Sequence, residues 1–244
     1  MLQVKNLQKS FGQLKALDGL SFAADDQQIT GILGPNGAGK TTCLRTLFGL
    51  LQPDCGEVMV DNINVLENPL EARRKIGIFP DKFGLYERLT SREQIRYFAN
   101  IHGICGADCE AAIERMVTSL QLQDIIDRRA AGFSQGQRMK VALAQALVHQ
   151  PKNLILDEPT RGLDVMSTRL LREILLDLKQ QGHCILFSSH VMQEVAALCD
   201  RVVIVASGKI AAQGTPQELC ELAGKTHLED AFVAIIGSEE GIAA

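Results

Sequence analysis

Short apolar runs of strand length alternate with stretches of helical spacing along most of the chain. One helical stretch, TTCLRTLFGLL (41–51), places Leu44, Leu47, Phe48 and Leu51 on one face, and MSTRLLREILLDLKQQ (166–181) is a second. This alternation predicts an α/β fold with a mostly parallel sheet. The segments that we expect to contain strands are LQVKNLQKSF (2–11), ALDGLSFAADDQQITGILG (16–34), PDCGEVMVDNINV (53–65), KIGIF (75–79), NLILD (153–157), HCILFSS (183–189), RVVIVAS (201–207) and KIAAQG (209–214).

The pattern changes between about Leu85 and Arg129, where helical periods dominate and strand signals vanish. We interpret this part as a helical insertion, at about 85–138, within one domain that spans 1–224. The tail, 225–244, is expected to be short and helical. Its Leu228, Phe232 and Ile236 fall at i, i+4 and i+8, which is typical of an amphipathic helix that docks on the body of a protein.

Composition and charge narrow the possible classes of protein. The chain has 244 residues, of which 46% are hydrophobic and 22% charged, as in a globular protein. Its net charge of −4 argues against a dedicated nucleic-acid binder, so no nucleic-acid partner is expected. Its seven cysteines are scattered and odd in number, and they indicate reduced thiols rather than a disulfide framework.

Nothing in the sequence indicates a leader or a membrane span. The first residues, MLQVKNLQKSF, lack the apolar centre of a signal peptide. No stretch reaches the roughly 18 to 20 apolar residues that a membrane helix needs. We therefore expect a cytoplasmic protein that reaches the cytoplasmic face of the cell membrane only through a partner.

A glycine-rich segment between an apolar strand, ITGIL, and an amphipathic helix matches the phosphate-loop pattern G-x-x-x-x-G-K-[ST]. Its glycines let backbone N–H groups turn inward around a polyphosphate, and the helix N-terminus adds a partial positive charge. A glycine-rich turn without a ligand is the alternative, which the full match and its context disfavour. The predicted cradle is Gly34, Pro35, Asn36, Gly37, Ala38, Gly39, Lys40, Thr41 and Thr42.

Within this cradle, three side chains have separate predicted roles. Lys40 is expected to reach the β- and γ-phosphates, Thr41 to bind Mg²⁺ through its hydroxyl, and Thr42 to donate to the α-phosphate. The strand NLILD ends in Asp157 and Glu158, at the edge of the sheet where ligands bind in such folds. Asp157 is predicted to hold Mg²⁺ through water, and Glu158 to orient or deprotonate the attacking water.

A third motif, Phe133-Ser134-Gln135-Gly136-Gln137, precedes a helical pattern and stands ahead of the acidic strand. It resembles the signature sequence of ABC-type ATPases, and its distance ahead of the acidic strand is typical of that family. Three further positions follow in the order of that family. Phe11 resembles the aromatic residue that stacks on adenine, Gly162-Leu163-Asp164 resembles the D-loop, and His190 resembles the switch histidine. The resemblance extends from about residue 2 to residue 220.

The resemblance implies a fold, ligands and a partner. The fold is a P-loop NTPase cassette with a mostly parallel core sheet, an antiparallel β subdomain and a helical insertion. The ligands are ATP and Mg²⁺. Two copies of the chain would pack head to tail as a homodimer, so that Ser134, Gln135, Gly136 and Gln137 of one copy face the γ-phosphate bound by the other. Asp164 would belong to the same nucleotide site, and His190 would sense the γ-phosphate during catalysis.

The sequence departs from the family pattern at two positions. The family usually has Gln where Asp81 stands, at the residue that meets Mg²⁺. A carboxylate can bind Mg²⁺, although that of Asp81 is one methylene shorter and adds negative charge. Asp81 is predicted as a third metal ligand beside Thr41 and Asp157. The second departure is Gln135, where Gly is more familiar. Its side chain is expected to point out of the loop.

Three functions are open at this point. The first is the energy subunit of a membrane transporter, with a polytopic permease received beside Phe83, Leu85 and Tyr86. The segment GLYERLT resembles exporters with two-subunit membrane partners, and the ATP-binding subunits of bacterial sodium exporters most of all. Drug and polysaccharide exporters have similar cassettes. The second function is a non-transport ABC ATPase acting on DNA or ribosomes, and the third is a small P-loop kinase or GTPase, which would not explain FSQGQ.

Overall fold

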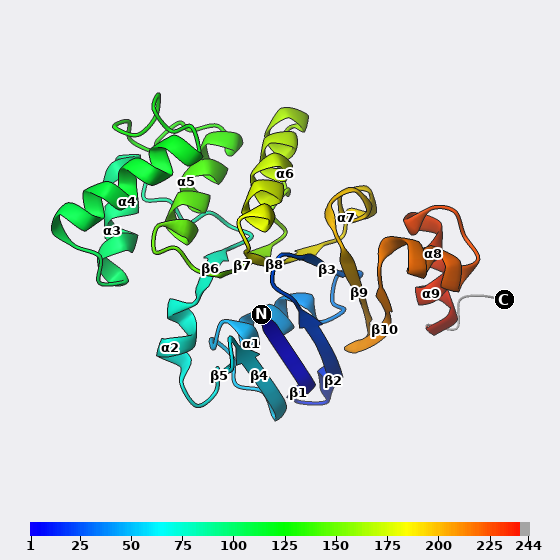
Figure 1. Cartoon of the computed structure of the whole chain (residues 1–244). Coiled ribbons are helices and arrows are strands. Elements are labelled where there is room, and N and C mark those ends of the chain that lie inside the picture. The colour runs from blue at the N-terminus through cyan, green and yellow to red at the C-terminus, as the bar shows by residue number, and fades with distance from the viewer. Residues whose placement is uncertain (240–244) are drawn as a thin grey trace.

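The structure, a computed structural model that describes residues 1–239, is built around a six-stranded sheet in the order β10-β9-β3-β8-β7-β6 (Figure 1). All neighbouring strands are parallel except β9 and β10, which are antiparallel. The predicted mostly parallel sheet is therefore confirmed. The strands are β3 (Ile29–Leu33), β6 (Ile76–Phe79), β7 (Asn153–Asp157), β8 (Cys184–Ser189), β9 (Arg201–Ala206) and β10 (Lys209–Gly214).

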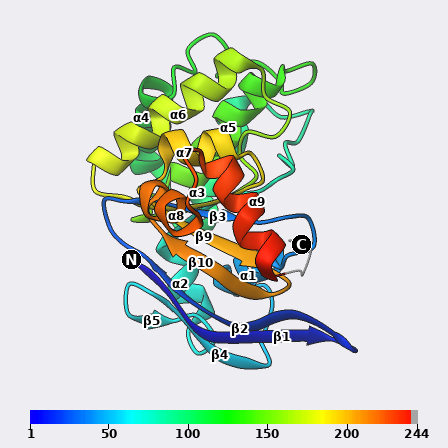
Figure 2. The ribbon, with the colours of Figure 1, turned by 90° about the vertical axis from the view of Figure 1, so that its right-hand side faces the viewer.

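A second, antiparallel sheet covers one face of the first. Its four strands, in the order β2-β1-β4-β5, are β1 (Leu2–Phe11), β2 (Leu14–Ala24), β4 (Cys55–Val60) and β5 (Ile63–Asn64). Alternate core-sheet residues, such as Ile32 and Leu186, pack with this sheet and with helix α1 (Lys40–Leu47) in one buried cluster. Figure 2 shows this sheet at the lower side and the helices of the insertion at the upper side.

The opposite face of the core sheet packs on helices. Its inward residues, such as Leu33 and Phe187, share a second buried cluster with α5 (Gln135–Leu147) and α6 (Val165–Gln180). This burial on both faces explains why the central strands are continuous apolar runs. The remaining helices are α2 (Pro69–Arg74), α3 (Ser91–Ile101), α4 (Gly106–Ser119), α7 (Met192–Leu198), α8 (Pro216–Ala223) and α9 (Leu228–Glu239).

In the C-terminal helix α9, Leu228, Phe232 and Ile236 are buried, as expected for an amphipathic helix on the body of the protein. The helix contacts α8, α7 and β10. A division of the chain into 1–224 and 225–244 stays a prediction, and residues 240–244 of that tail lie outside the described residues. Across the described part of the chain, no helix combines the length and the apolar character needed to cross a membrane.

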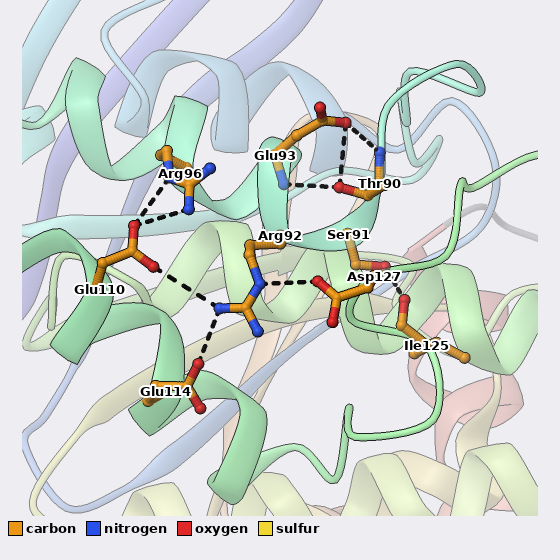
Figure 3. Close-up of polar contacts among 9 residues, drawn as sticks. All are labelled: Thr90, Ser91, Arg92, Glu93, Arg96, Glu110, Glu114, Ile125 and Asp127. Carbon is orange, nitrogen blue, oxygen red and sulfur yellow. Dashed lines mark hydrogen bonds and ion pairs between the residues drawn. The ribbon is translucent and has the colours of Figure 1, made fainter.

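Charged side chains hold the helical insertion together. Arg92 of α3 donates to Asp127 and to Glu114 of α4, at 2.9 and 2.8 Å, and Arg96 donates to Glu110 at 2.7 Å (Figure 3). At the start of α3, Thr90 and Glu93 form a capping box, which satisfies two backbone N–H groups of the first turn. The ion pairs thus link α3 to α4 and to Asp127, and the capping box stabilises the first turn of α3.

Two histidines join the insertion to the core. The rings of His102, at the end of α3, and His149, after α5, stack with centroids 3.6 Å apart. Nε2 of His149 lies 3.1 Å from the carbonyl oxygen of Ile76, and Nδ1 is buried without a partner. Because a carbonyl only accepts, Nε2 carries the proton of the neutral ring. Burial, and the neighbouring His102, lower the pKa of His149 to about 4.

This lowered pKa makes the stability of the fold depend on pH. An unfolded His149 binds a proton below about pH 6.5, whereas the folded ring resists it down to about pH 4, so stability falls as the pH drops through this window. Between pH 7.5 and 5 we expect His149 to contribute a loss of about 1 to 2 kcal/mol in the free energy of unfolding. Urea unfolding at several pH values, compared with His149→Gln, measures it. An equally steep pH dependence in the variant would contradict the assignment.

Candidate active site

A cleft of about 1140 Å³ opens at the carboxyl ends of the core strands, where ligands of open α/β sheets bind. Its walls come from β1, the loop before α1, the segment after β6, and the ends of β7 and β8. The predicted site residues that line it are Phe11, Pro35, Asn36, Gly37, Gly39, Lys40, Thr41, Thr42, Asp81, Asp157, Glu158 and His190. Positions up to 179 residues apart in the sequence, from Phe11 to His190, thus meet in one place.

The glycine-rich loop after β3 is pressed against backbone from both sheets. A Cβ added at Gly34 would collide with the carbonyl oxygen of Val205, and one at Gly39 with that of Ala16. Gly39 also has φ +108 and Gly37 has φ +85, which side chains rarely adopt. Gly37, in contrast, has open space beside it. The loop therefore needs glycine at 34 and 39 for packing and at 37 for its backbone turn.

Lys40 lies at the first position of α1, directly beneath this loop. Its Nζ donates to the carbonyl oxygens of Gly34 and Pro35, at 2.6 and 3.1 Å, and the residue is only 7% exposed. Burial lowers the pKa of Lys40, while the nearby carboxylates of Glu158 and Asp157 oppose this shift. The ammonium group is thus held inside the loop, where a phosphate cradled by the loop would meet it.

The acidic end of β7 is fixed by the neighbouring strand. The hydroxyl of Ser188 in β8 donates to Oδ1 of the buried Asp157 at 2.6 Å. The backbone N–H of Glu158 donates to the same hydroxyl at 3.1 Å. Glu158 has φ +48, a backbone conformation that turns the chain away from the strand. The contacts with Ser188 thus fix the carboxylate of Asp157 and the backbone of Glu158.

Glu158 and His190 contact each other across the cleft. Oε2 of Glu158 lies 2.7 Å from Nδ1 of His190, with the glutamate side chain 13% exposed and the histidine 50% exposed. This distance allows a hydrogen bond, and it orients the carboxylate toward the side of the cleft that carries His190. Both residues were predicted from the sequence, but their direct contact was not.

Asp81 also lies in the cleft, and its carboxylate is paired. Arg161, which follows the acidic strand, donates from Nη1 to both carboxylate oxygens of Asp81, at 3.1 and 3.0 Å. Arg161 and Ser188 were not predicted from the sequence. A hydroxyl at the carboxyl end of a neighbouring parallel strand was a signal for Ser188. Arg161 had no such signal in the sequence, because its partner Asp81 lies 80 positions earlier in the chain.

Most apolar side chains of the segment after Asp81 pack into the core. Leu85 is buried, and Phe83 is half-buried with its ring packed edge-on against Phe79 at 5.0 Å. Of the three apolar residues singled out there, only Tyr86 is exposed. Its ring lies 6.2 Å from that of Tyr97, which is also exposed on α3. Phe83 and Leu85 therefore complete the core, and of the three only Tyr86 lies where a partner could contact it.

The signature residues lie outside the cleft. Ser134 is the N-cap of α5, where its hydroxyl accepts from the N–H of Gln137 and its own N–H donates to the side chain of Gln137. Ser134 and Gln135 are exposed. Gly136 packs against Ser167, whose N–H donates to Asp164 at 2.7 Å. This backbone hydrogen bond lowers the pKa of Asp164. The signature loop and Asp164 therefore form one surface, apart from the phosphate cradle.

The residues fit a nucleotide with a magnesium ion better than a metal caged by protein alone. Across the residues that the structure describes, no three His, Cys, Asp or Glu side chains group together as a metal site. Magnesium bound to nucleotides usually takes one or two protein ligands, together with phosphate oxygens and waters. Thr41 in the loop and Asp157 at the strand end supply such a pair.

Comparisons with known proteins agree with this arrangement. The model of the ABC transporter family matches residues 17–161. The chain belongs to the ABC transporter family. The ABC transporter ATP-binding protein NatA of Bacillus subtilis is 41% identical over 209 residues, which make up 85% of each chain. The Nod factor export ATP-binding protein I of Burkholderia lata is 35% identical over 220 residues, 90% of this chain and 72% of that protein.

Solved ABC proteins confirm the fold expected from the sequence. The structure of an ATP-binding subunit of an ABC transporter superimposes with a TM-score of 0.87 at 29% identity, and the match covers 96% of this chain and 99% of that one. The ABC cassette, with its parallel core sheet, antiparallel sheet and helical part, is thereby established for this chain. As an ABC ATPase, the chain binds and hydrolyses ATP.

The buried position of Lys40 gives a test of the cradle. Lys40→Met keeps an unbranched side chain of nearly the same length but removes its terminal charged group. We expect ATP affinity to fall by about 10- to 100-fold, the effect of losing hydrogen bonds to a charged group. Equilibrium binding of a fluorescent ATP analogue measures it. Lys209→Met, at an exposed lysine paired with Asp18, is the control. Unchanged affinity in Lys40→Met would exclude a phosphate contact by Lys40.

Proposed function

We propose that this ABC ATPase is the energy subunit of a membrane exporter, with Na⁺ as the best single candidate for the cargo. The observation that carries the proposal is the half-built site: an ATP cleft in one chain and an exposed signature loop elsewhere on it. The similarity to a Nod factor export protein and the segment GLYERLT support export. Drug and polysaccharide exporters remain the alternative cargo classes, since the ATPase does not contact the cargo.

The proposed working form is a head-to-tail homodimer. Phe11, at the mouth of the cleft, stacks on adenine, while the backbone of 34–42, Lys40 and Thr42 hold the phosphates. Ser134, Gln135, Gly136 and Gln137 of the second copy close the cleft over the γ-phosphate, with Asp164 beside them. The N-terminus of α5 and the hydroxyl of Ser134 suit an anion at that place. The exposure of Ser134 and Gln135 supports this proposal.

For hydrolysis, we assign the base to Glu158. Its carboxylate takes a proton from water, whose oxygen then bonds to the γ-phosphorus while the bond from this phosphorus to the β–γ bridging oxygen breaks. His190 positions Glu158 through their 2.7 Å contact and meets the γ-phosphate. Bound Mg²⁺ would neutralise charge developing on the phosphate oxygens. Thr41 and Asp157, the latter through water, are proposed to hold it.

We propose that a polytopic permease docks where α3 meets the segment after β6. Tyr86 in that segment is 54% exposed, and on α3 Tyr97 is 49% and Ile101 61% exposed. Aromatic residues of this kind are enriched at protein interfaces. The ATPase would thus lie on the cytoplasmic face of the cell membrane, held by its partner. No nucleic-acid partner is proposed, in keeping with the net charge of −4.

Isolation with the native partner tests the transport function. The tagged chain, purified in mild detergent, is expected to bring down a polytopic membrane protein, and Tyr86→Ala together with Tyr97→Ala should weaken this association. Leu222→Ala, at an apolar position on α8 that is 71% exposed, is the matched control. Co-purification of ribosomal proteins or DNA in place of a permease would favour the non-transport function. Flux of Na⁺, a drug or a glycan in reconstituted vesicles then decides the cargo.

Glu158→Gln tests the catalytic assignment. We expect hydrolysis to fall by about 10²- to 10⁴-fold, the usual worth of a general base, while ATP binding persists. Size-exclusion chromatography with ATP and Mg²⁺ should then show a trapped dimer. Glu173→Gln, on the exposed side of α6, is a control with the same change of charge. Hydrolysis near the wild-type rate in Glu158→Gln would refute the role.

Asp81→Ala tests the third metal ligand, since Gln, the usual residue of the family here, could itself bind Mg²⁺. Because Arg161 already binds both oxygens of Asp81, we expect the Mg²⁺ concentration for half-maximal hydrolysis to change by less than about twofold, well under the effect of losing a charged ligand. A magnesium titration of ATPase activity measures it. A large rise in the Mg²⁺ requirement would instead make Asp81 a direct ligand.

A further inference from the structure

Gln94 of α3 is a fully buried polar residue, 0% exposed, in the core of the helical insertion. Its amide makes three hydrogen bonds. Oε1 accepts from the backbone N–H of Tyr86 at 3.0 Å and from Nε2 of Gln145 at 3.4 Å, and Nε2 donates to the carbonyl oxygen of Leu89 at 3.4 Å. Burying an amide costs free energy unless it is hydrogen-bonded, so these contacts define its place.

The two partners of Oε1 belong to different parts of the site. Tyr86 carries its amide inside the protein and its ring outside, on the proposed docking surface. Gln145 lies on α5, the helix that begins at Gln135 directly after the N-cap Ser134. One oxygen atom therefore joins the docking surface to the helix that carries the signature residues.

The chain around Gln94 adds a second connection between the same two regions. The backbone N–H of Ala131 donates to Glu87 and that of Ala130 to Leu89, at 3.1 and 3.0 Å. The acceptor segment follows Tyr86 directly, and the donor segment runs into Phe133 and the signature. Arg138 on α5 also lies 3.5 Å from the carboxylate of Glu87. The backbone ladder fixes the segments side by side, whereas Gln94 reaches the helix itself.

We propose that Gln94 is a positioning residue that transmits displacement of the docking surface to the Ser134–Gln137 loop, an inference that rests on the proposed docking of a permease. When a partner shifts the backbone at Tyr86, the amide of Gln94 shifts with it and draws α5 along through Gln145. An apolar residue of the same size would fill the space but would leave the N–H of Tyr86 without its acceptor and α5 without this link.

The test compares coupling with stability. In the complex reconstituted in liposomes, the stimulation of ATP hydrolysis by the membrane partner is the rate in the complex divided by the rate of the ATPase chain alone. In Gln94→Met we expect this ratio to fall by about 3- to 10-fold, within the range of mutations along coupling networks. Gln145→Met, which breaks only the link to α5, should lower it in the same direction and serves if Gln94→Met does not fold.

Ser91→Ala is the matched control. Ser91 is equally buried in α3, and its hydroxyl donates to Ile125 at 2.9 Å, but that bond does not reach α5. This variant should lower the melting temperature and leave the stimulation ratio near the wild-type value. Wild-type stimulation in both Gln94→Met and Gln145→Met, or an equal loss of the ratio in Ser91→Ala, would overturn the proposal.

Amide hydrogen exchange in the ATPase chain alone separates this inference from the docking proposal. In Gln94→Met we expect faster exchange both at Tyr86 and in the first turn of α5. Faster exchange at Tyr86 with an unchanged α5 would overturn the link. If the wild-type chain shows no membrane partner or no stimulation, the docking proposal fails, and the exchange data alone decide whether Gln94 joins the two regions.

Discussion

The site depends on the wedging of the phosphate loop between backbone carbonyls of the two sheets. Gly34 faces Val205 of β9, and Gly39 faces Ala16 of β2, each so closely that a methyl group would not fit. The N–H of Gly208 adds a hydrogen bond to Ala38 at 3.1 Å. The shape of the loop therefore depends on the packing of both sheets against it. Glycine is required there by packing between layers as well as by the approach of phosphate.

Features formed by residues close together in the sequence could be predicted, whereas contacts between distant residues could not. The phosphate loop, the acidic end of β7 and the helix after the signature motif were predicted, since neighbouring residues define them. The pairs Ser188–Asp157 and Arg161–Asp81 were not, because they join positions 31 and 80 residues apart. The burial of Leu85 was missed for the same reason. Helix α2 is six residues long and too short to show a period.

The predicted residues lie on two surfaces, the nucleotide cleft and the surface formed by the signature loop and Asp164. Gly136 packs closely on Ser167 at the start of α6, and Asp164 caps that helix. Exposed Val165 and Met166 continue this surface at 84% and 72%. Large apolar side chains so exposed gain free energy when another surface covers them. The same face that presents Ser134 thus also has the apolar content of an interface.

The buried amide of Gln94 fixes its neighbours more strictly than an apolar side chain would. Dispersion contacts weaken gradually when groups slide past one another, whereas a hydrogen bond fixes both distance and direction. Since Gln94 bonds the backbone of Tyr86 and also α5, neither can shift alone without leaving a buried polar group unpaired, at a cost of about 1 to 3 kcal/mol. This penalty makes the insertion act as one body. A lever between a docking surface and a distant loop needs that property, because a compliant core would absorb the displacement before it reached Ser134.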